Sequence, residues 1–260
     1  MPATVTNAFR IALLIAFSIG WASLSPAAQA GDIYDAAVHH AGRNSADLKR
    51  DRTDKPADVL RLAGIKPGMK VADVLAADGY YSELLSYVVG ADGHVLLLNN
   101  PAYDQFSNNA WRDRIEKHRL RNVEHRTIDM ASMGLGDATL DAVVMIKVYH
   151  DLYWVAPQDG WPKIDVGAVL DQVAKALKPG GILVVVDHSA KAGTGSAAAQ
   201  DLHRIDEAFA RKDFESHGFV FEAESDALRR SDDARDRISY KAPMLGKTDR
   251  FVYVFHKPGA

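Results

Sequence analysis

Residues 69–100, MKVADVLAADGYYSELLSYVVGADGHVLLLNN, decide the fold of this chain. Their pattern predicts a short apolar strand over 71–75, a helix over 80–89 and a second strand over 94–98. A tight turn of small residues joins the first strand to the helix. This layout is that of a nucleotide-type cofactor site at the edge of a parallel sheet.

The rest of the chain continues the alternation of apolar runs and amphipathic stretches. We expect strands over 123–128, 140–148, 182–186, 219–223 and 250–255, and helices over 55–62, 103–120, 166–177 and 202–217. This order predicts a doubly wound, Rossmann-like α/β fold, with a seven-stranded sheet in three α/β/α layers. No helix is predicted between the last two strands, so we expect them to pair as an antiparallel hairpin at one edge.

The first thirty residues have the features of a secretory signal peptide. Arg10 precedes an apolar run over 11–24, and Ala28-Gln29-Ala30 is a small-x-small cleavage site. The run is short and interrupted for a transmembrane helix, although an uncleaved N-terminal anchor is an alternative. We therefore expect a signal peptide over 1–30 and a single domain over 31–260. The protein would be exported, to a bacterial periplasm, with no stable membrane insertion after cleavage.

Composition and charge exclude several classes of protein. The 260 residues are 47% hydrophobic and 25% charged, which is ordinary for a globular domain. The net charge of -3 gives no indication of nucleic-acid binding. The absence of cysteine rules out a cysteine nucleophile, a thiolate metal site and disulfides. The oligomeric state is not indicated.

A group of histidines and aspartates follows the fourth and fifth predicted strands. Its members are His150, Asp151, Asp187, His188, His203 and Asp206. Loops after successive strands of a doubly wound sheet converge on one crevice, and His203 and Asp206 lie one turn apart on a predicted helix. The group could hold a substrate hydroxyl or amine and remove its proton. His150 is our first choice of general base, with His188 or His203 second.

The same group allows two other interpretations. Histidines near strand ends are often structural, and Asp–His pairs also suit zinc, manganese or iron. No H-x-x-x-H or H-x-H spacing supports a metal, so we assign no metal ligands.

Several segments resemble those of class I S-adenosylmethionine (SAM)-dependent methyltransferases. They are Ile65–Val71, Asp73–Tyr80, Leu140–Met145 and Leu177–Leu183. Other segments resemble a group of exported bacterial predicted methyltransferases, namely Lys49–Asp51, Tyr149–Trp154, Asp187–Ala190, His203–Asp206 and Gly246–Phe251. The resemblance implies the fold of that class and methyl transfer from SAM to a small molecule. On this interpretation His150, Asp187, His188 and His203 carry the substrate chemistry.

The resemblance also places SAM at the carboxyl ends of the first three strands. The residues it assigns to the cofactor are Asp73, Ala77, Asp78, Gly79, Tyr80, Asn99, Asn100 and Asp129. Asp73 would steady the turn or meet the SAM ammonium through water. The two asparagines would replace the acidic residue that grips the ribose, and Asp129 would meet the adenine amine.

Two departures from the class predict weakened binding of SAM. Leu75 and Ala77 stand where glycine is usual, and a left-handed backbone would cost alanine about 1 kcal/mol or more. Asn99 and Asn100 lack the charge-assisted strength of a carboxylate. Two alternatives therefore stay open: a periplasmic binding protein that keeps the fold without SAM, and a metal-assisted enzyme that uses the histidine and aspartate loops. An exported methyltransferase would also need a supply of SAM outside the cytoplasm.

Overall fold

The computed structural model describes residues 1–2, 32–116 and 119–259. The predicted signal peptide therefore lies outside the described residues, apart from its first two. Across the described ranges, no helix has both the length and the apolar character needed to cross a membrane.

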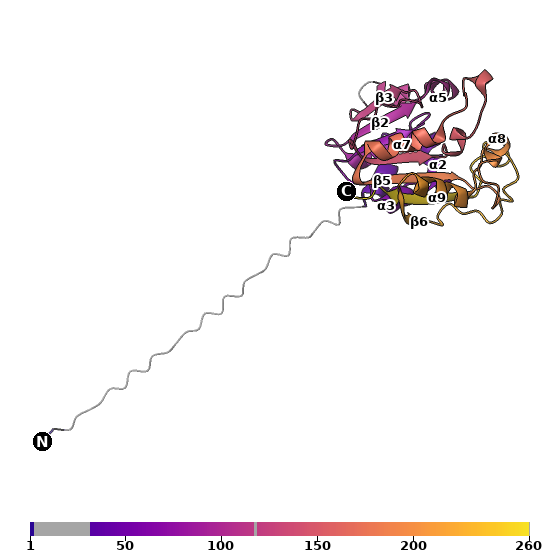
Figure 1. The fold of residues 1–260 in the computed structure, drawn as a ribbon. Coiled ribbons are helices and arrows are strands. Elements are labelled where there is room, and N and C mark those ends of the chain that lie inside the picture. The colour runs from indigo at the N-terminus through magenta and orange to yellow at the C-terminus, as the bar shows by residue number, and fades with distance from the viewer. Residues whose placement is uncertain (3–31, 117–118, 260) are drawn as a thin grey trace. The chain divides into compact units, whose positions relative to one another are not determined.

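A seven-stranded sheet forms the centre of the domain, with the strand order β3-β2-β1-β4-β5-β7-β6 (Figure 1). The strands are β1 Lys70–Val74, β2 His94–Asn99, β3 Val123–Thr127, β4 Leu140–Ile146, β5 Leu177–His188, β6 Val220–Glu224 and β7 Arg250–His256. The first five strands are parallel, and β7 runs antiparallel to both β5 and β6. The predicted fold, with its antiparallel edge pair, is confirmed. The strand order reverses between β1 and β4, where a ligand crevice is expected at the carboxyl ends.

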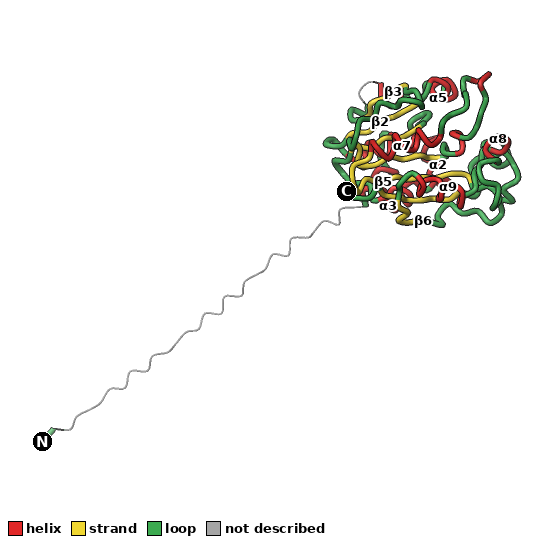
Figure 2. The backbone as a smooth tube through the Cα atoms, in the orientation of Figure 1, coloured by secondary structure: helices red, strands yellow, loops and turns green. Residues whose placement is uncertain are grey.

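Helices cover both faces of the sheet. They are α1 Ile33–Val38, α2 Ser45–Asp54, α3 Pro56–Ala63, α4 Tyr80–Val89, α5 Pro101–Phe106, α6 Arg112–Ile115, α7 Val166–Ala176, α8 Ala198–Leu202 and α9 Glu207–Ser216. Short 3-10 helices occupy His150–Leu152 and Pro157–Asp159. Helices α7 and α9 lie in front of the yellow strands in Figure 2. Helices α1, α3 and α4 pack on the opposite face, which gives the expected three layers.

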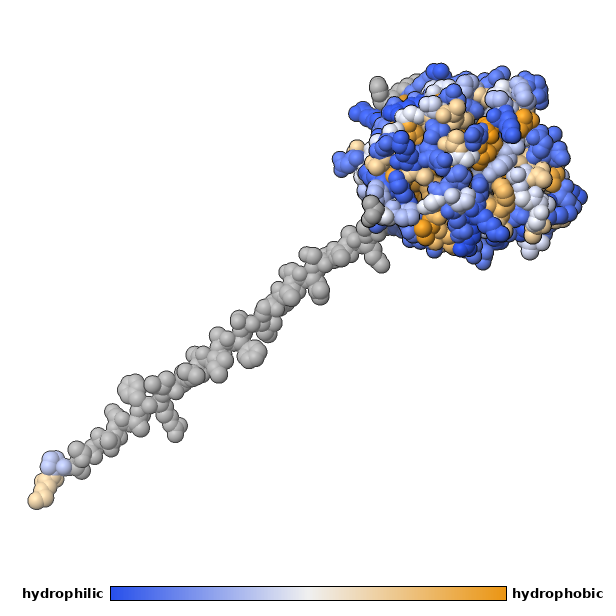
Figure 3. All heavy atoms as spheres, in the orientation of Figure 1, coloured by the Kyte–Doolittle hydropathy of each residue, from blue (hydrophilic) through white to orange (hydrophobic). Residues whose placement is uncertain are grey.

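Two apolar cores, one on each face, explain the sequence of β4. Val143 and Met145 pack in the core that contains Leu170 of α7, whereas Val144 packs in the core that contains Leu84 of α4. Because successive side chains of a strand point to opposite faces, a strand buried on both faces is apolar without alternation. The visible outer surface is mostly polar with scattered apolar side chains (Figure 3), which is usual for a folded domain.

The predictions of two continuous helices, over 103–120 and 202–217, are wrong. The segment 103–120 forms two short helices, α5 and α6, separated by Asn108 and Asn109 in left-handed conformations (φ 51° and 53°) that interrupt a helix. The segment 202–217 is broken after α8, because the Ile205 amide donates to the His188 carbonyl (2.9 Å). His203 consequently caps α8 and Asp206 caps α9, so the two do not share a helix face as predicted.

Candidate functional site

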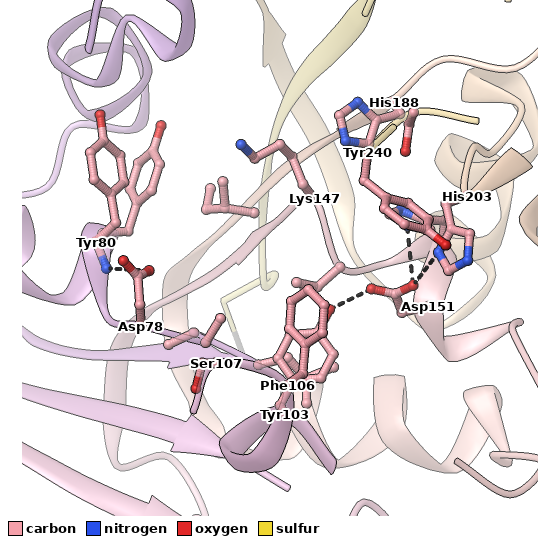
Figure 4. Close-up of a pocket in the computed structure, with 18 of the residues that line it drawn as sticks. Asp78, Tyr80, Tyr103, Phe106, Ser107, Lys147, Asp151, His188, His203 and Tyr240 are labelled. Carbon is pink, nitrogen blue, oxygen red and sulfur yellow. Dashed lines mark hydrogen bonds and ion pairs between the residues drawn. The ribbon is translucent and has the colours of Figure 1, made fainter. Parts of the chain in front are cut away.

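A cavity of about 880 Å³ lies at the carboxyl ends of β1, β4 and β5. Its wall includes the turn after β1, part of α2 and α5, the segments after β4 and β5, and the loop before β7 (Figure 4). The predicted site residues that line it are Asp73, Ala77, Asp78, Tyr80, His150, His188 and His203. The structure thus brings the predicted cofactor turn and the predicted histidines to one cavity.

The turn after β1 has the backbone of a glycine-rich turn, although two of its residues are not glycine. Leu75, Ala77 and Gly79 are all left-handed, with φ of 55°, 53° and 79°. The Asn99 amide holds this conformation, since it accepts from the Ala77 N–H (2.9 Å) and donates to the Ala77 carbonyl (3.0 Å). At Gly79, an added Cβ would lie 2.7 Å from Leu97 Cδ1. The turn therefore keeps the close backbone approach that a nucleotide-type cofactor needs.

Replacing Ala77 with glycine is expected to stabilise the protein by roughly 0.5–1 kcal/mol. The change removes about 1–2 kcal/mol of left-handed strain and adds about 0.5–1 kcal/mol of backbone entropy cost. Ala76, which is not left-handed, provides the matched control, and Ala76→Gly is expected to destabilise by about 0.5–1 kcal/mol. Urea unfolding of both variants is the measurement. Equal destabilisation by the two changes would contradict strain at Ala77.

Three residues predicted to contact the cofactor bond other parts of the chain. Asn99 is fully buried and uses its amide on Ala77 and on Asp104 (2.9 Å). Asn100 caps α5 by accepting from the Tyr103 N–H (2.9 Å). Asp129 is exposed and accepts from the Ala131 N–H (2.9 Å). None of the three lines the cavity, and Asn99 positions the turn through the backbone of Ala77.

Asp73 and Tyr80 anchor helix α4 at the cavity. Asp73 accepts from the Ser82 hydroxyl (2.7 Å), and burial raises the pKa of Asp73 to about 7. The Tyr80 hydroxyl donates to Asp51 (2.5 Å), while the guanidinium of Arg50 lies 3.8 Å from the Tyr80 ring centroid. Helix α2 is thereby fixed against the cavity, where Arg50 lines the wall.

A cluster of cations around one aspartate forms part of the wall and was not predicted. Asp54 pairs with Arg50 (2.8 Å), Lys147 (2.8 Å) and Arg250 (2.6 Å). Burial would raise the pKa of Asp54, but the cations outweigh it and hold this pKa below its usual range. Burial, with Arg50 nearby, lowers the pKa of Lys147 to about 8. In the sequence, Lys147 interrupts an apolar run, and in the structure its backbone is left-handed (φ 61°).

His150 lies between two carboxylates and is not suited to act as a base. Its Nδ1 is 2.6 Å from Asp187 and its Nε2 is 3.1 Å from Asp151. Burial alone would lower the pKa of His150, but Asp151 and Asp187 raise it to about 10. A protonated imidazole with both N–H groups engaged does not accept a proton, which favours another residue as the general base. Asp187 does not line the cavity and positions His150 instead.

His188, unlike His150, has the properties of a general base, because it is uncharged near pH 7 and keeps one ring nitrogen available. Its Nδ1 is bonded to the Thr248 hydroxyl (2.7 Å), and the residue lines the cavity. Burial and the positive charges of His150 and Lys147 hold the pKa of His188 well below its ordinary value. His188 is therefore neutral near pH 7. No hydrogen bond of its Nε2 is found within the described parts of the chain, which leaves that nitrogen for a ligand.

Comparison with known proteins finds similarity to methyltransferases. A family model described as a methyltransferase domain matches residues 73–185. The matched region contains the turn after β1, β4 and His150. The match covers less than half of the chain and indicates similarity to SAM-dependent methyltransferases, whose cofactor is SAM.

Individual relatives are distant. The ubiquinone/menaquinone biosynthesis C-methyltransferase UbiE of Teredinibacter turnerae is 24% identical over 145 residues, which are 55% of this chain and 53% of that protein. The chain thus spans about half the length of this curated relative. A solved SAM-dependent methyltransferase from Aquifex aeolicus aligns with a TM-score of 0.55 at 21% identity, over 81% of this chain and 97% of that one.

The fold by itself does not fix the reaction. The solved [4+2]-cyclase SpnF aligns with a TM-score of 0.57 at 14% identity, over 83% of this chain and 82% of that one. One fold thus occurs in proteins named for different reactions, and the chemistry of this chain depends on the residues of its own cavity.

Proposed function

We propose that this protein transfers a methyl group from SAM to a hydroxyl or amine of a small molecule bound in the cavity. The observation that carries the proposal is the shared cavity, whose wall includes the turn Leu75–Asp78 and also His188 and His203. Its volume of about 880 Å³ is within the range of ligand sites in enzymes. A cofactor on the turn would lie in the same space as a substrate beside the histidines.

The residues present fit SAM at the turn rather than at the end of β2. The left-handed backbone at Leu75 and Ala77 would approach the cofactor, as the glycines of the class do. Lys147 is a cation that lines the same cavity and would attract an anionic group, such as a carboxylate. SAM supplies an electrophilic methyl group on a sulfonium. The missing ribose carboxylate supports the expectation of weaker binding.

His188 is the general base in this proposal. It would take the proton of the acceptor hydroxyl or amine through Nε2 while Thr248 holds Nδ1. Methyl transfer depends mainly on alignment of the acceptor with the methyl group, and base assistance adds to it. Tyr103 and Trp154 also line the cavity and would pack against the acceptor. Export to the periplasm is part of the proposal, and it requires SAM to be supplied there.

Transfer of labelled methyl from SAM to panels of phenols, amines and carboxylates tests the proposed reaction. We expect at least one class of hydroxyl or amine acceptor to gain label in proportion to enzyme. The same assay on Ala77→Asp, which puts a bulky charged side chain on the turn, should lose transfer. No transfer to any acceptor, in folded protein that also fails to bind SAM, would instead favour the binding-protein alternative.

A further inference from the structure

We propose that His150, Asp151 and His203 bind one divalent transition-metal ion in the wall of the cavity. Each of the three offers one ligand atom, and these atoms lie within 4.8 Å of one another. This inference goes beyond the proposed function, because metal binding requires neither SAM nor a methyl acceptor.

The spacing of the ligand atoms suits a shared ion. Asp151 Oδ1 is 3.1 Å from His150 Nε2 and 3.1 Å from His203 Nδ1. An ion about 2.0–2.2 Å from each nitrogen and oxygen would hold its ligand atoms roughly 3–3.5 Å apart. Figure 4 shows Asp151 between His203 and the neighbouring cavity residues, with dashed lines converging on its carboxylate.

A second set of residues orients these ligands, as is usual around protein-bound metals. Asp187 is bonded to His150 Nδ1 (2.6 Å) and accepts from the His150 backbone N–H (2.8 Å). That arrangement fixes the ring so that Nε2 points to Asp151, which is the outer-shell pattern of metal-bound histidine. The Tyr103 hydroxyl donates to Asp151 Oδ2, so Oδ1 is left for the ion. The indole of Trp161 donates to the Asp151 carbonyl (2.8 Å) and holds the backbone.

Backbone strain at His203 supports a ligand role. The residue has φ of 49°, a left-handed conformation that is costly for a non-glycine residue. Its position is fixed by the end of α8 and by the pairing of Ile205 with Ser189. Strained residues of this kind concentrate at functional sites, where the surrounding structure holds them in place.

Charge balance also favours a divalent ion. Asp187 is fully buried and Asp151 is 8% exposed, so two carboxylates are withdrawn from water around His150. Buried charges are costly unless they are paired. A divalent ion bound to neutral histidines would neutralise both of these negative charges.

The ligand set indicates the class of metal and its use. Two imidazoles and one carboxylate suit zinc, iron or manganese, and they leave coordination positions open. All three ligands line the cavity, so an open position would face a bound substrate. An oxygen atom of that substrate, from a hydroxyl or a carboxylate, would complete the coordination.

Titration calorimetry with ZnCl₂ and MnCl₂ tests the site on chain purified without a histidine tag and stripped with EDTA. We expect one ion per chain for at least one of the two metals. Asp151→Asn and His203→Asn should each weaken binding by at least about 10–100-fold, the loss typical of removing an outer-shell partner of a ligand. Asparagine tolerates the left-handed backbone at position 203, so His203→Asn is expected to fold even if Asp151→Asn does not.

His217→Ala is the matched control, because His217 also pairs with an aspartate, Asp171 (2.7 Å), and does not line the cavity. It should bind the metal as the wild type does. The absence of a one-to-one complex with either metal would overturn the proposal, and so would unchanged affinity in His203→Asn. A parallel titration with S-adenosylhomocysteine reports cofactor binding independently, so failure of the metal site is distinguishable from failure of the proposed methyl transfer.

Discussion

Asp54→Asn is expected to lower the free energy of unfolding by about 3–5 kcal/mol, the cost typical of removing one partner from a buried ion pair. Asp54 is 3% exposed and its carboxylate bonds Arg50, Lys147 and Arg250. Asparagine preserves the shape of the side chain but leaves the neighbouring cations without their shared anion. Urea unfolding at pH 7 measures the effect.

Asp58→Asn provides the control for this prediction. Asp58 pairs with Arg61 at the surface (3.0 Å), where both side chains are well exposed. Exposed ion pairs contribute about 0–1 kcal/mol to stability, so Asp58→Asn should change the free energy of unfolding very little. A loss below 1 kcal/mol in Asp54→Asn would show that Asp54 does not hold the cluster together.

The same carboxylate predicts the direction of a pH effect. The pKa of Asp54 is lower in the folded chain than its ordinary value, so its stabilisation is fully present above about pH 4. That stabilisation is lost as the pH falls below about 4, because the unfolded chain binds the proton more tightly. The wild type should therefore lose more stability than Asp54→Asn between neutral and acid pH. Equal losses would contradict the assignment.

His188→Ala is expected to lower kcat for methyl transfer by about 10²–10⁴-fold, the usual contribution of a general base. Binding of S-adenosylhomocysteine should change little, because His188 is assigned to the acceptor and not to the turn. His217→Ala should retain wild-type kcat, since that histidine lies outside the cavity. Steady-state kinetics with an acceptor from the labelling assay provide the measurement.

The pH profile separates a base from a merely structural histidine. The pKa of His188 is held well below its ordinary value by burial and nearby cations, so the neutral form persists in mild acid. The acid limb of kcat/KM for the wild type should then fall at a pH well below 6.5, the ordinary histidine value. An acid limb near that value, or a His188→Ala variant with unchanged kcat, would assign the proton transfer to another group.

The periodicity of apolar residues correctly predicted those helices and strands that are determined by residues close together in the sequence. The strand β1, the helix Tyr80–Val89 and the strand β2 follow from periodicity within 69–100, and the structure has them within a residue or so of their predicted ends. The predicted helix at 202–217 was wrong because the Ile205 amide pairs with the carbonyl of His188, a contact from a different element. Tertiary pairing of this kind leaves no periodic signal in the sequence.

The candidate site was only partly predictable for the same reason. His188 and His203 were placed correctly at the cavity, because both follow strand β5, whose end meets the crevice. The pairing of Asp54 with Arg250 spans 196 positions, and no local pattern reveals it. Asn99 was predicted to contact the cofactor because it lies at the end of β2. In the structure its side-chain amide forms two hydrogen bonds with the backbone of Ala77.

Calorimetric titration with S-adenosylhomocysteine tests for a SAM site without any knowledge of the acceptor. We expect one site per chain with Kd below about 1 mM, equivalent to a binding free energy of about -4 kcal/mol or stronger. Binding should be lost in Ala77→Asp and retained in His188→Ala. No heat and no thermal shift at millimolar ligand, in protein that is folded, would contradict a SAM site on the turn after β1.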